Sequence, residues 1–266
     1  MPRAERQEPM YLQKDFMESA AARELRILAE YLYPLKTFRK YNIQDIIVFF
    51  GSARIPHPRI TNRELRKVDY TNLSSAENEK LHKKRKLKTY YEQATKLAYL
   101  LTKWSKSLPE GSRRFVVTSG GGPGIMEAAN RGASLARGLS IGLNIELPFE
   151  QIPNEYITPS LSFDFHYFFM RKFWFMYLAK ALIVFPGGFG TLDELFEALT
   201  LEQTQKSNKE MPIVLFGREY WSEIIDFDRL VDWGMISPED KDIIFFADDV
   251  EHAFDYLKAQ LTKHYL

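Results

Sequence analysis

Short, uninterrupted apolar runs are the feature that most constrains how this chain can fold. They recur between charged or amphipathic stretches: IIVFF at 46–50, RFVVTS at 114–119, LSIGLNI at 139–145, ALIVF at 181–185, PIVLF at 212–216 and IIFF at 243–246. Strands that are apolar throughout, rather than alternating, are typical of a parallel sheet covered on both faces. Helical patterns separate most of these runs, which predicts an α/β fold: a Rossmann-like, doubly wound parallel sheet with helices on both faces.

Two segments stand apart from this alternation. Residues 14–40 are charged but carry Leu25, Leu28 and Leu32 at helical spacing. We therefore expect an N-terminal helical extension over 1–43 and the Rossmann-like domain over 44–266. Within that domain, residues 54–88 are polar and basic, and are interpreted as a partly helical insertion that leads into a helix starting at about Tyr90.

Composition narrows the possible partners. The 36 basic and 35 acidic residues leave a formal net charge of +1, so no global field gathers nucleic acid or a membrane surface. Only the basic run at 80–88 favours nucleic acid, and such a run is usually a solvated face. Cysteine is absent, which excludes disulfides and thiolate chemistry. The first residues, MPRAERQEPM, contain no apolar run, so we expect no signal peptide and a cytoplasmic protein.

Three of the predicted strands end in glycine-containing loops. The positions concerned are Gly51 and Ser52 in the first loop, Gly120, Gly121, Gly122 and Gly124 in the second, and Gly187, Gly188, Gly190 and Thr191 in the third. In a parallel sheet these loops share one edge, and the helices after the second and third loops direct their N-termini there, which favours an anion such as phosphate. Tight turns alone are the alternative. No dinucleotide or triphosphate motif is present, which argues against NAD and against a nucleoside-triphosphatase.

The third loop is followed by a candidate catalytic carboxylate. Glu194 is expected in the first helical turn, where the helix dipole keeps it ionised. Beside a phosphoribosyl group it would stabilise an oxocarbenium-like ribose. The alternative is a capping box in which Thr191 and Glu194 cap the helix. Glu127, in the first turn after the second loop, is a second candidate carboxylate.

A charged pair, Arg171 and Lys172, interrupts an aromatic-rich helix predicted over Tyr167–Ala179. Arginine binds phosphate through two parallel hydrogen bonds, so Arg171 is a candidate substrate-binding and catalytic residue. A surface salt bridge is the alternative interpretation.

These residues resemble the LOG ("Lonely guy") family of cytokinin riboside 5′-monophosphate phosphoribohydrolases, a family often labelled as lysine decarboxylases. The family motif PGGxGTxxE stands here at 186–194, and the family's Arg-Lys pair at 171–172. The resemblance covers about 44–262, and the long N-terminal region looks like the longer bacterial branch. A histidine that many members carry two residues before the arginine is replaced by Phe169.

The resemblance implies an enzyme of the AMP nucleosidase or phosphoribohydrolase type that releases free base and ribose 5-phosphate from AMP or a cytokinin riboside 5′-monophosphate. It implies Arg171 and Glu194 as catalytic residues, with Met170 and Lys172 beside the substrate. The alternative is a non-catalytic nucleotide or molybdenum-cofactor-type carrier on the same fold. We find no sequence context for a pyridoxal-phosphate lysine, no histidine spacing for a metal and no sign of a cofactor.

Self-association is expected from the same aromatic helix. One helix face cannot bury all of its aromatic side chains against its own sheet, so some should pack against another subunit. The family resemblance also implies a homodimer or a higher homo-oligomer. The alternative is a helix buried on all sides within one chain.

Overall fold

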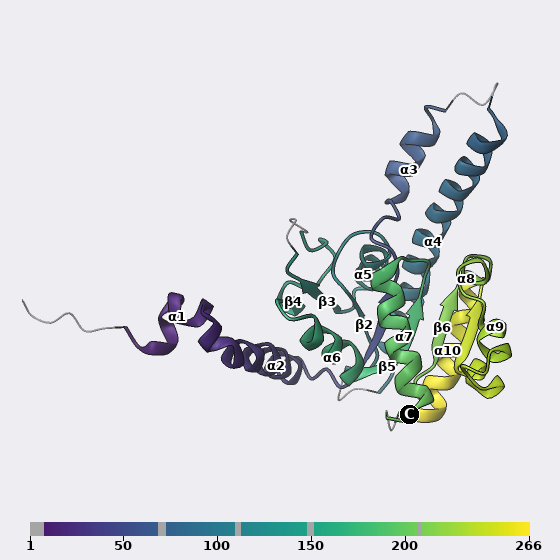
Figure 1. The fold of residues 1–266 in the computed structure, drawn as a ribbon. Helices are drawn as coiled ribbons and strands as arrows, with labels where there is room; N and C mark the ends of the chain where they lie inside the picture. Colours follow the sequence, from purple (N-terminus) through teal and green to yellow (C-terminus); the bar gives the residue numbers. More distant parts are fainter. Residues whose placement is uncertain (1–7, 69–72, 110–112, 148–151, 207–208) are drawn as a thin grey trace, which may run out of the picture.

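The computed structural model describes residues 8–68, 73–109, 113–147, 152–206 and 209–266. They form an all-parallel sheet with the strand order β4-β3-β2-β1-β5-β6-β7 (Figure 1). The strands are β1 (Ile46–Phe50), β2 (Val116–Ser119), β3 (Ser140–Ile145), β4 (Ser162–Phe165), β5 (Ala179–Val184), β6 (Ile213–Phe216) and β7 (Ile244–Ala247). Every apolar run identified in the sequence supplies a strand, which confirms the predicted sheet.

The strand order reverses next to β1. The chain builds β2, β3 and β4 outward on one side of β1, then crosses back and adds β5, β6 and β7 on the other side. Parallel pairing places Phe50 beside Val184, and the amide of Ser52 donates to the carbonyl of Pro186 at 3.0 Å. In open α/β sheets, ligands bind at such a switch point, outside the carboxyl ends of the strands.

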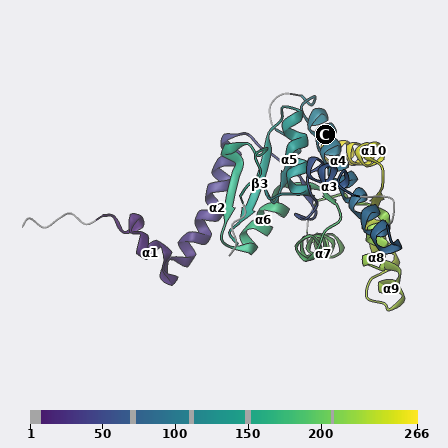
Figure 2. The ribbon, with the colours of Figure 1, turned by 90° about the horizontal axis from the view of Figure 1, so that it is seen from above.

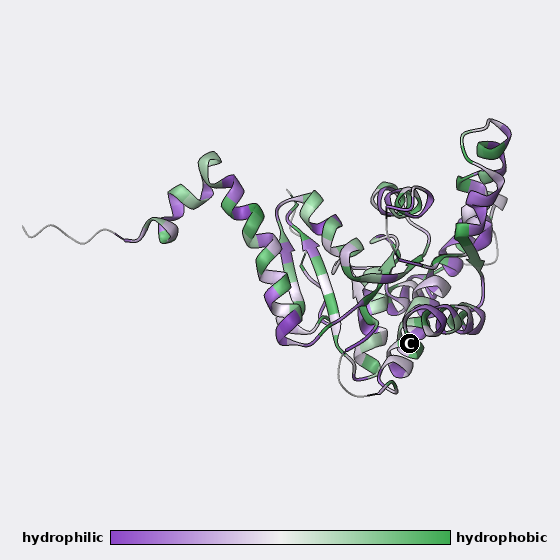
Figure 3. Cartoon of the chain, turned by 90° about the horizontal axis from the view of Figure 1, so that it is seen from below, coloured by the Kyte–Doolittle hydropathy of each residue, from purple (hydrophilic) through white to green (hydrophobic). Residues whose placement is uncertain are grey.

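Helices cover both faces of the sheet, which confirms the doubly wound fold (Figure 2). One face packs against α4 (Ser75–Ser105), α5 (Ile125–Leu135) and α10 (Val250–Tyr265). The other packs against α2 (Arg23–Lys40), α6 (Phe168–Leu178), α7 (Phe189–Gln203) and α8 (Arg218–Ile224). Alternate residues of each strand point to opposite faces, so Ile47 and Phe49 join one core and Val48 joins the other. Figure 3 shows the apolar strands between these helices.

The N-terminal region is only partly in contact with the sheet domain. Helix α1 (Lys14–Glu18) lies away from it (Figure 2). Helix α2 packs on α6 and the sheet: Phe38 is buried, and the indole Nε1 of Trp174 donates to the carbonyl of Glu30 at 2.9 Å.

The polar segment 54–88 contains α3 (Pro58–Leu65) and the first part of α4, which project together from the body (Figure 1). Residues 69–72 of this segment lie outside the described residues. The prediction that the helix starts near Tyr90 was wrong, because α4 begins at Ser75. Its start is stabilised by a capping box in which the amide of Glu77 donates to Ser74 Oγ, and the amide of Ser74 donates to Glu77.

The remaining described helices are short. Helix α9 (Phe227–Asp232) follows α8, and 3-10 turns lie at Met10–Leu12, Ala20–Ala22, Pro159–Leu161 and Pro238–Ile243. No helix among the described residues combines the length and the apolar character needed to cross a bilayer.

Candidate active site

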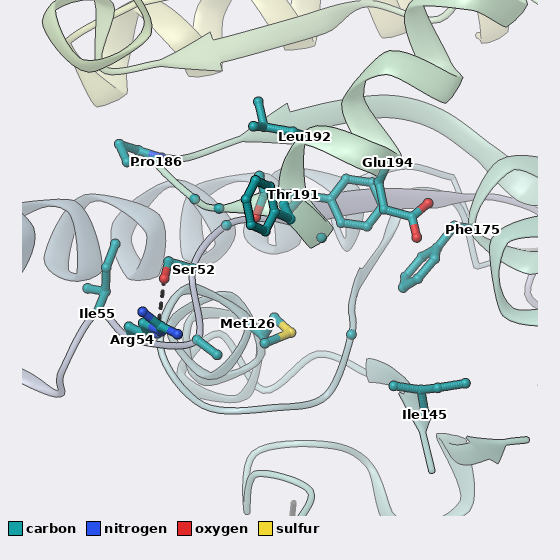
Figure 4. A pocket seen from close by; sticks show the side chains of 18 of the residues that line it. Ser52, Arg54, Ile55, Met126, Ile145, Phe175, Pro186, Thr191, Leu192 and Glu194 are labelled. Carbon is teal, nitrogen blue, oxygen red and sulfur yellow. Dashed lines mark hydrogen bonds between the residues drawn. The ribbon is translucent and has the colours of Figure 1, made fainter. Parts of the chain in front are cut away.

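The three glycine loops line one cavity of about 690 Å³ at the carboxyl ends of β1, β2 and β5 (Figure 4). The lining residues that the sequence analysis named are Gly51, Ser52, Gly120, Arg171, Gly187, Gly188, Gly190, Thr191 and Glu194. Residues far apart in the chain therefore meet at the switch point of the sheet, as the parallel topology requires.

The glycines of the second and third loops have different surroundings. At Gly124, φ is +73°, and a Cβ atom would lie 2.2 Å from the carbonyl oxygen of Ser52, so the second loop packs directly on the first. At Gly188 and Gly190 an added Cβ would meet nothing within 4 Å. The third loop thus exposes bare backbone to the cavity, an arrangement that suits close approach of an anion.

Helix α7 begins at Phe189, earlier than the sequence pattern predicts. Gly188 is its N-cap, and the carbonyl of Gly188 accepts hydrogen bonds from the amides of Thr191 and Leu192, both at 3.0 Å. The amides of Gly188, Phe189 and Gly190 precede these, and among the described residues they donate to no backbone carbonyl. A bound phosphate would therefore meet these three amides rather than that of Thr191.

The early helix start corrects two expectations for Glu194. The carboxylate lies in the second turn rather than the first, and no side-chain cap is formed at the N-terminus of α7. The capping-box interpretation was therefore wrong. The helix dipole also contributes less than expected, because its effect falls off within the first turn.

Glu194 and Arg171 form a buried pair at the wall of the cavity. Their side chains are only 3% and 15% exposed, and Arg171 Nη2 lies 3.8 Å from Glu194 Oε1. This distance makes an ion pair but no hydrogen bond. Among the described residues, neither carboxylate oxygen of Glu194 has a hydrogen-bond partner of good geometry, and Arg171 Nε has none either. Buried polar groups are normally satisfied, so this pair presents unused hydrogen-bonding capacity to a ligand.

The pKa of Glu194 differs from the sequence expectation that the helix dipole keeps this carboxylate ionised. Burial raises the pKa of this carboxyl group to about 7, although Lys172 and Arg171 act to lower it. Desolvation thus outweighs the positive charges nearby. A carboxyl group that titrates near neutrality is suited to charge stabilisation or proton transfer at physiological pH.

Several other expected site residues lie outside the cavity lining. Gly121 and Gly122 each accept a hydrogen bond from the side-chain amide of Asn154, at 2.9 and 3.1 Å. Glu127 accepts from the hydroxyl of Tyr91 at 2.6 Å. Met170 is buried in the core beneath α6.

Lys172 also lies outside the lining and is turned toward α7. The structure therefore separates residues that shape the glycine loops from residues that face the cavity.

The cavity also contains residues that the sequence analysis missed. Arg54 follows the first loop, and its amide donates to Ser52 Oγ at 3.0 Å (Figure 4). Phe168 and Phe175 contribute an apolar wall next to Arg171, whose guanidinium carbon lies 5.3 and 5.5 Å from their ring centroids. Tyr220 donates from its hydroxyl to the carbonyl of Gly187 at 2.8 Å and so supports the third loop. For Arg54, its place two residues after Ser52 was the available signal.

Residues 126–257 match the family model described as possible lysine decarboxylase. The chain is 35% identical over 88 residues to the cytokinin riboside 5′-monophosphate phosphoribohydrolase LOG1 of Arabidopsis thaliana, covering 32% of this chain and 40% of that protein. It is 29% identical over 137 residues to the probable phosphoribohydrolase LOGL5 of Oryza sativa subsp. japonica, covering 50% of this chain and 53% of that one. The chain thus spans about two-fifths to one-half of the length of these relatives.

Solved structures with a similar outline include two proteins connected with molybdenum cofactor. The molybdenum cofactor binding protein of Rippkaea orientalis superposes with a TM-score of 0.47 at 19% identity, over 81% of this chain and 96% of that one. The molybdenum cofactor carrier protein of Chlamydomonas reinhardtii superposes with a TM-score of 0.48 at 18% identity, over 82% of this chain and 99% of that one.

Proposed function

We propose that this chain, whose residues 126–257 match the family described as possible lysine decarboxylase and which is similar to curated proteins named phosphoribohydrolases, hydrolyses the N-glycosidic bond of a purine nucleoside 5′-monophosphate. AMP is the substrate that we favour, with an N6-modified cytokinin nucleotide as the alternative base. The observation that carries the proposal is the buried pair of Arg171 and Glu194, which faces a glycine-lined cavity with its hydrogen-bonding capacity unused.

The cavity offers distinct surroundings for each part of such a nucleotide. The 5′-phosphate would bind at the start of α7, on the amides of Gly188, Phe189 and Gly190. Arg54 lines the same cavity and would supply a positive charge to this anion. Apolar residues including Phe168 and Phe175 would contact the base. This division supports a nucleoside monophosphate over a free nucleoside.

The reaction follows from placing Glu194 beside the ribose. As the bond between C1′ and the base nitrogen breaks, its electron pair leaves with the base and positive charge develops on the ribose. Ionised Glu194 stabilises that charge, and Arg171 holds the phosphoribosyl group in position. Water then adds its hydroxyl to C1′ and its remaining proton goes to the base, which yields free base and ribose 5-phosphate.

A non-catalytic nucleotide carrier is the second candidate function. A carrier needs phosphate-binding loops but gains nothing from a buried carboxylate. Burial of the charged Glu194 costs free energy, and an anion bound beside it would add to that cost. Decarboxylation of lysine through pyridoxal phosphate would require a cofactor-binding lysine, and the described residues that line the cavity include none.

We further propose that the chain self-associates through α6. Tyr31 of α2 packs on Phe173 and Trp174 of this helix, yet Phe168, Phe169 and Tyr177 remain about half exposed. A second copy would cover them. Light scattering at micromolar concentration tests this, and a strictly monomeric mass would contradict it.

The function is tested by incubating the protein with AMP, other nucleoside monophosphates and adenosine, and measuring free base by chromatography. We expect AMP to react much faster than adenosine, because the nucleoside lacks the phosphate anchor. Equal rates would remove the argument for phosphate anchoring. Binding of AMP without release of adenine would favour the carrier.

A further inference from the structure

Two adjacent cations on α6 point in different directions. Consecutive helical residues lie about 100° apart around the helix axis. Arg171 accordingly lines the cavity, whereas Lys172 does not and extends toward α7. The side chain of Lys172 is only 18% exposed, so it is not an ordinary solvated surface lysine.

Lys172 Nζ contacts three carboxylates of α7. It lies 2.8 Å from Glu197 Oε2, 2.9 Å from Asp193 Oδ2 and 3.3 Å from Glu194 Oε2. The first two carboxylates are 34% and 62% exposed, while the side chain of Glu194 is 3% exposed. Lys172 therefore links two partly exposed carboxylates to the buried carboxylate of Glu194 at the cavity wall.

Glu194 therefore lies between two cations, of which only Arg171 lines the cavity and can bind a ligand. Arg171 lies 3.8 Å from Oε1 on the cavity side and Lys172 lies 3.3 Å from Oε2 on the other side. A ligand phosphate entering the cavity would compete for Arg171, because arginine binds phosphate well. Lys172 is shielded from such competition, since it does not line the cavity.

We propose that Lys172 is a positioning residue, which holds the Glu194 carboxylate charged and oriented from outside the cavity while Asp193 and Glu197 hold Lys172. It touches no substrate in this role, in contrast to the substrate-binding role expected from the sequence. The inference rests on the proposed catalytic role of Glu194 and deepens it: it assigns substrate binding to Arg171 and support of the carboxylate to Lys172.

A consequence for pH dependence follows from the charges around Glu194. The groups that face it are Lys172 and Arg171 from α6 and Glu197 from α7. Burial works against the charged form of Lys172, yet hydrogen bonds to Glu197 and Asp193 raise its pKa overall. Lys172 therefore stays protonated across the neutral range. Removal of Lys172 would raise the pKa of Glu194 above its value of about 7 and leave that carboxyl group mostly protonated at neutral pH.

The experiment compares pH–rate profiles for AMP hydrolysis in three variants. Lys172→Met removes the charge and keeps the length, Lys172→Arg keeps the charge, and Lys96→Met removes an ion pair with Glu251 remote from the cavity. For Lys172→Met we expect the acid limb of kcat to move up by about one pH unit and turnover at pH 7 to fall about fivefold. Its KM should change little, turnover should recover toward pH 9, and Lys172→Arg should restore most of the wild-type profile.

Two results would overturn the proposal. An increase in KM for Lys172→Met with an unshifted profile would show contact with the substrate, and an unchanged kcat would show a bystander. If the wild-type protein releases no base, the proposed function fails, and positioning is then measured directly by carbon NMR titration of labelled glutamates. Glu194→Gln assigns the Glu194 signal, and a titration midpoint of Glu194 that is the same with and without Lys172 would refute the role.

Discussion

Two buried carboxylates, at opposite ends of the same sheet, are treated very differently by their surroundings. Asp45 precedes β1, is 2% exposed, and accepts hydrogen bonds from the amide of Phe115 and from Arg114 Nε, the latter at 2.6 Å. Glu194, at the carboxyl end, is equally buried, but its nearest arginine stands 3.8 Å away and its oxygens are not hydrogen-bonded among the described residues.

Asp45 is a carboxylate that serves the fold, whereas Glu194 is the carboxylate to which we assign a role toward a ligand. Burial raises the pKa of both groups. At Asp45 the hydrogen bonds and Arg114 oppose that shift and tie β1 to the segment before β2. At Glu194 the desolvation cost is left less compensated, which is a common feature of functional sites. Each of the following variants tests one side of this contrast.

The largest effect is expected for Glu194→Gln. This change keeps the shape of the side chain but removes the charge that stabilises the developing cation on ribose. Turnover of AMP should fall on the order of a hundredfold or more, with the fold intact by circular dichroism. Near-normal turnover in a folded protein would remove Glu194 from the mechanism.

Asp45→Ala should show the opposite behaviour. Loss of this partner leaves the buried amide of Phe115 without its acceptor and removes the ion pair of Arg114, which still donates to the carbonyl of Tyr265. We expect a cost of about 3 kcal/mol in the free energy of unfolding. Denaturant titration measures this loss. The kcat of the remaining folded protein should be unchanged, since Asp45 lies at the end of the sheet away from the cavity. A free energy of unfolding equal to that of the wild type would contradict the structural role of Asp45.

Arg171→Lys should be more damaging than Lys172→Arg. The first change retains charge but loses the planar fork that binds phosphate bidentately, and we expect turnover to fall by more than about tenfold. The second keeps a cation beside three carboxylates and should be tolerated. Steady-state kinetics on both purified variants decide the matter. A reversed order would mean that α6 is rotated relative to the phosphate loop.

The smallest effect concerns stability. The pKa of Glu194 is about 7 in the folded protein and about 4.3 in an unfolded chain. The folded state therefore binds more protons between these values, and the stability contributed by the protonated form is lost as pH rises through 7. Glutamine cannot ionise, so Glu194→Gln should match the wild type near pH 4 and exceed it at pH 8.

The expected difference at pH 8 is on the order of 1–3 kcal/mol. Denaturant titrations at both pH values measure it. A variant that is no more stable than the wild type at pH 8 would mean that the buried carboxylate is better compensated than its contacts indicate.

Some features of this protein are determined by local sequence. The apolar runs specify strands buried on both faces, and their alternation with helices specifies a parallel sheet, because only that arrangement covers such strands twice. The parallel sheet in turn brings the loops at Gly51, Gly120 and Gly188 to one edge. Arg171 and Glu194 were predictable as site residues from their motif.

Other features were decided by tertiary contacts that no local pattern records. The start of α7 at Phe189 depends on the turn at Gly188, and glycine is compatible with several backbone conformations. The contact of Lys172 with three carboxylates of α7 depends on the rotation of α6 against α7, which is decided by how the two helices pack. The raised pKa of Glu194, about 7, depends on the desolvation created by packing of the whole site, which outweighs the positive charges of Lys172 and Arg171.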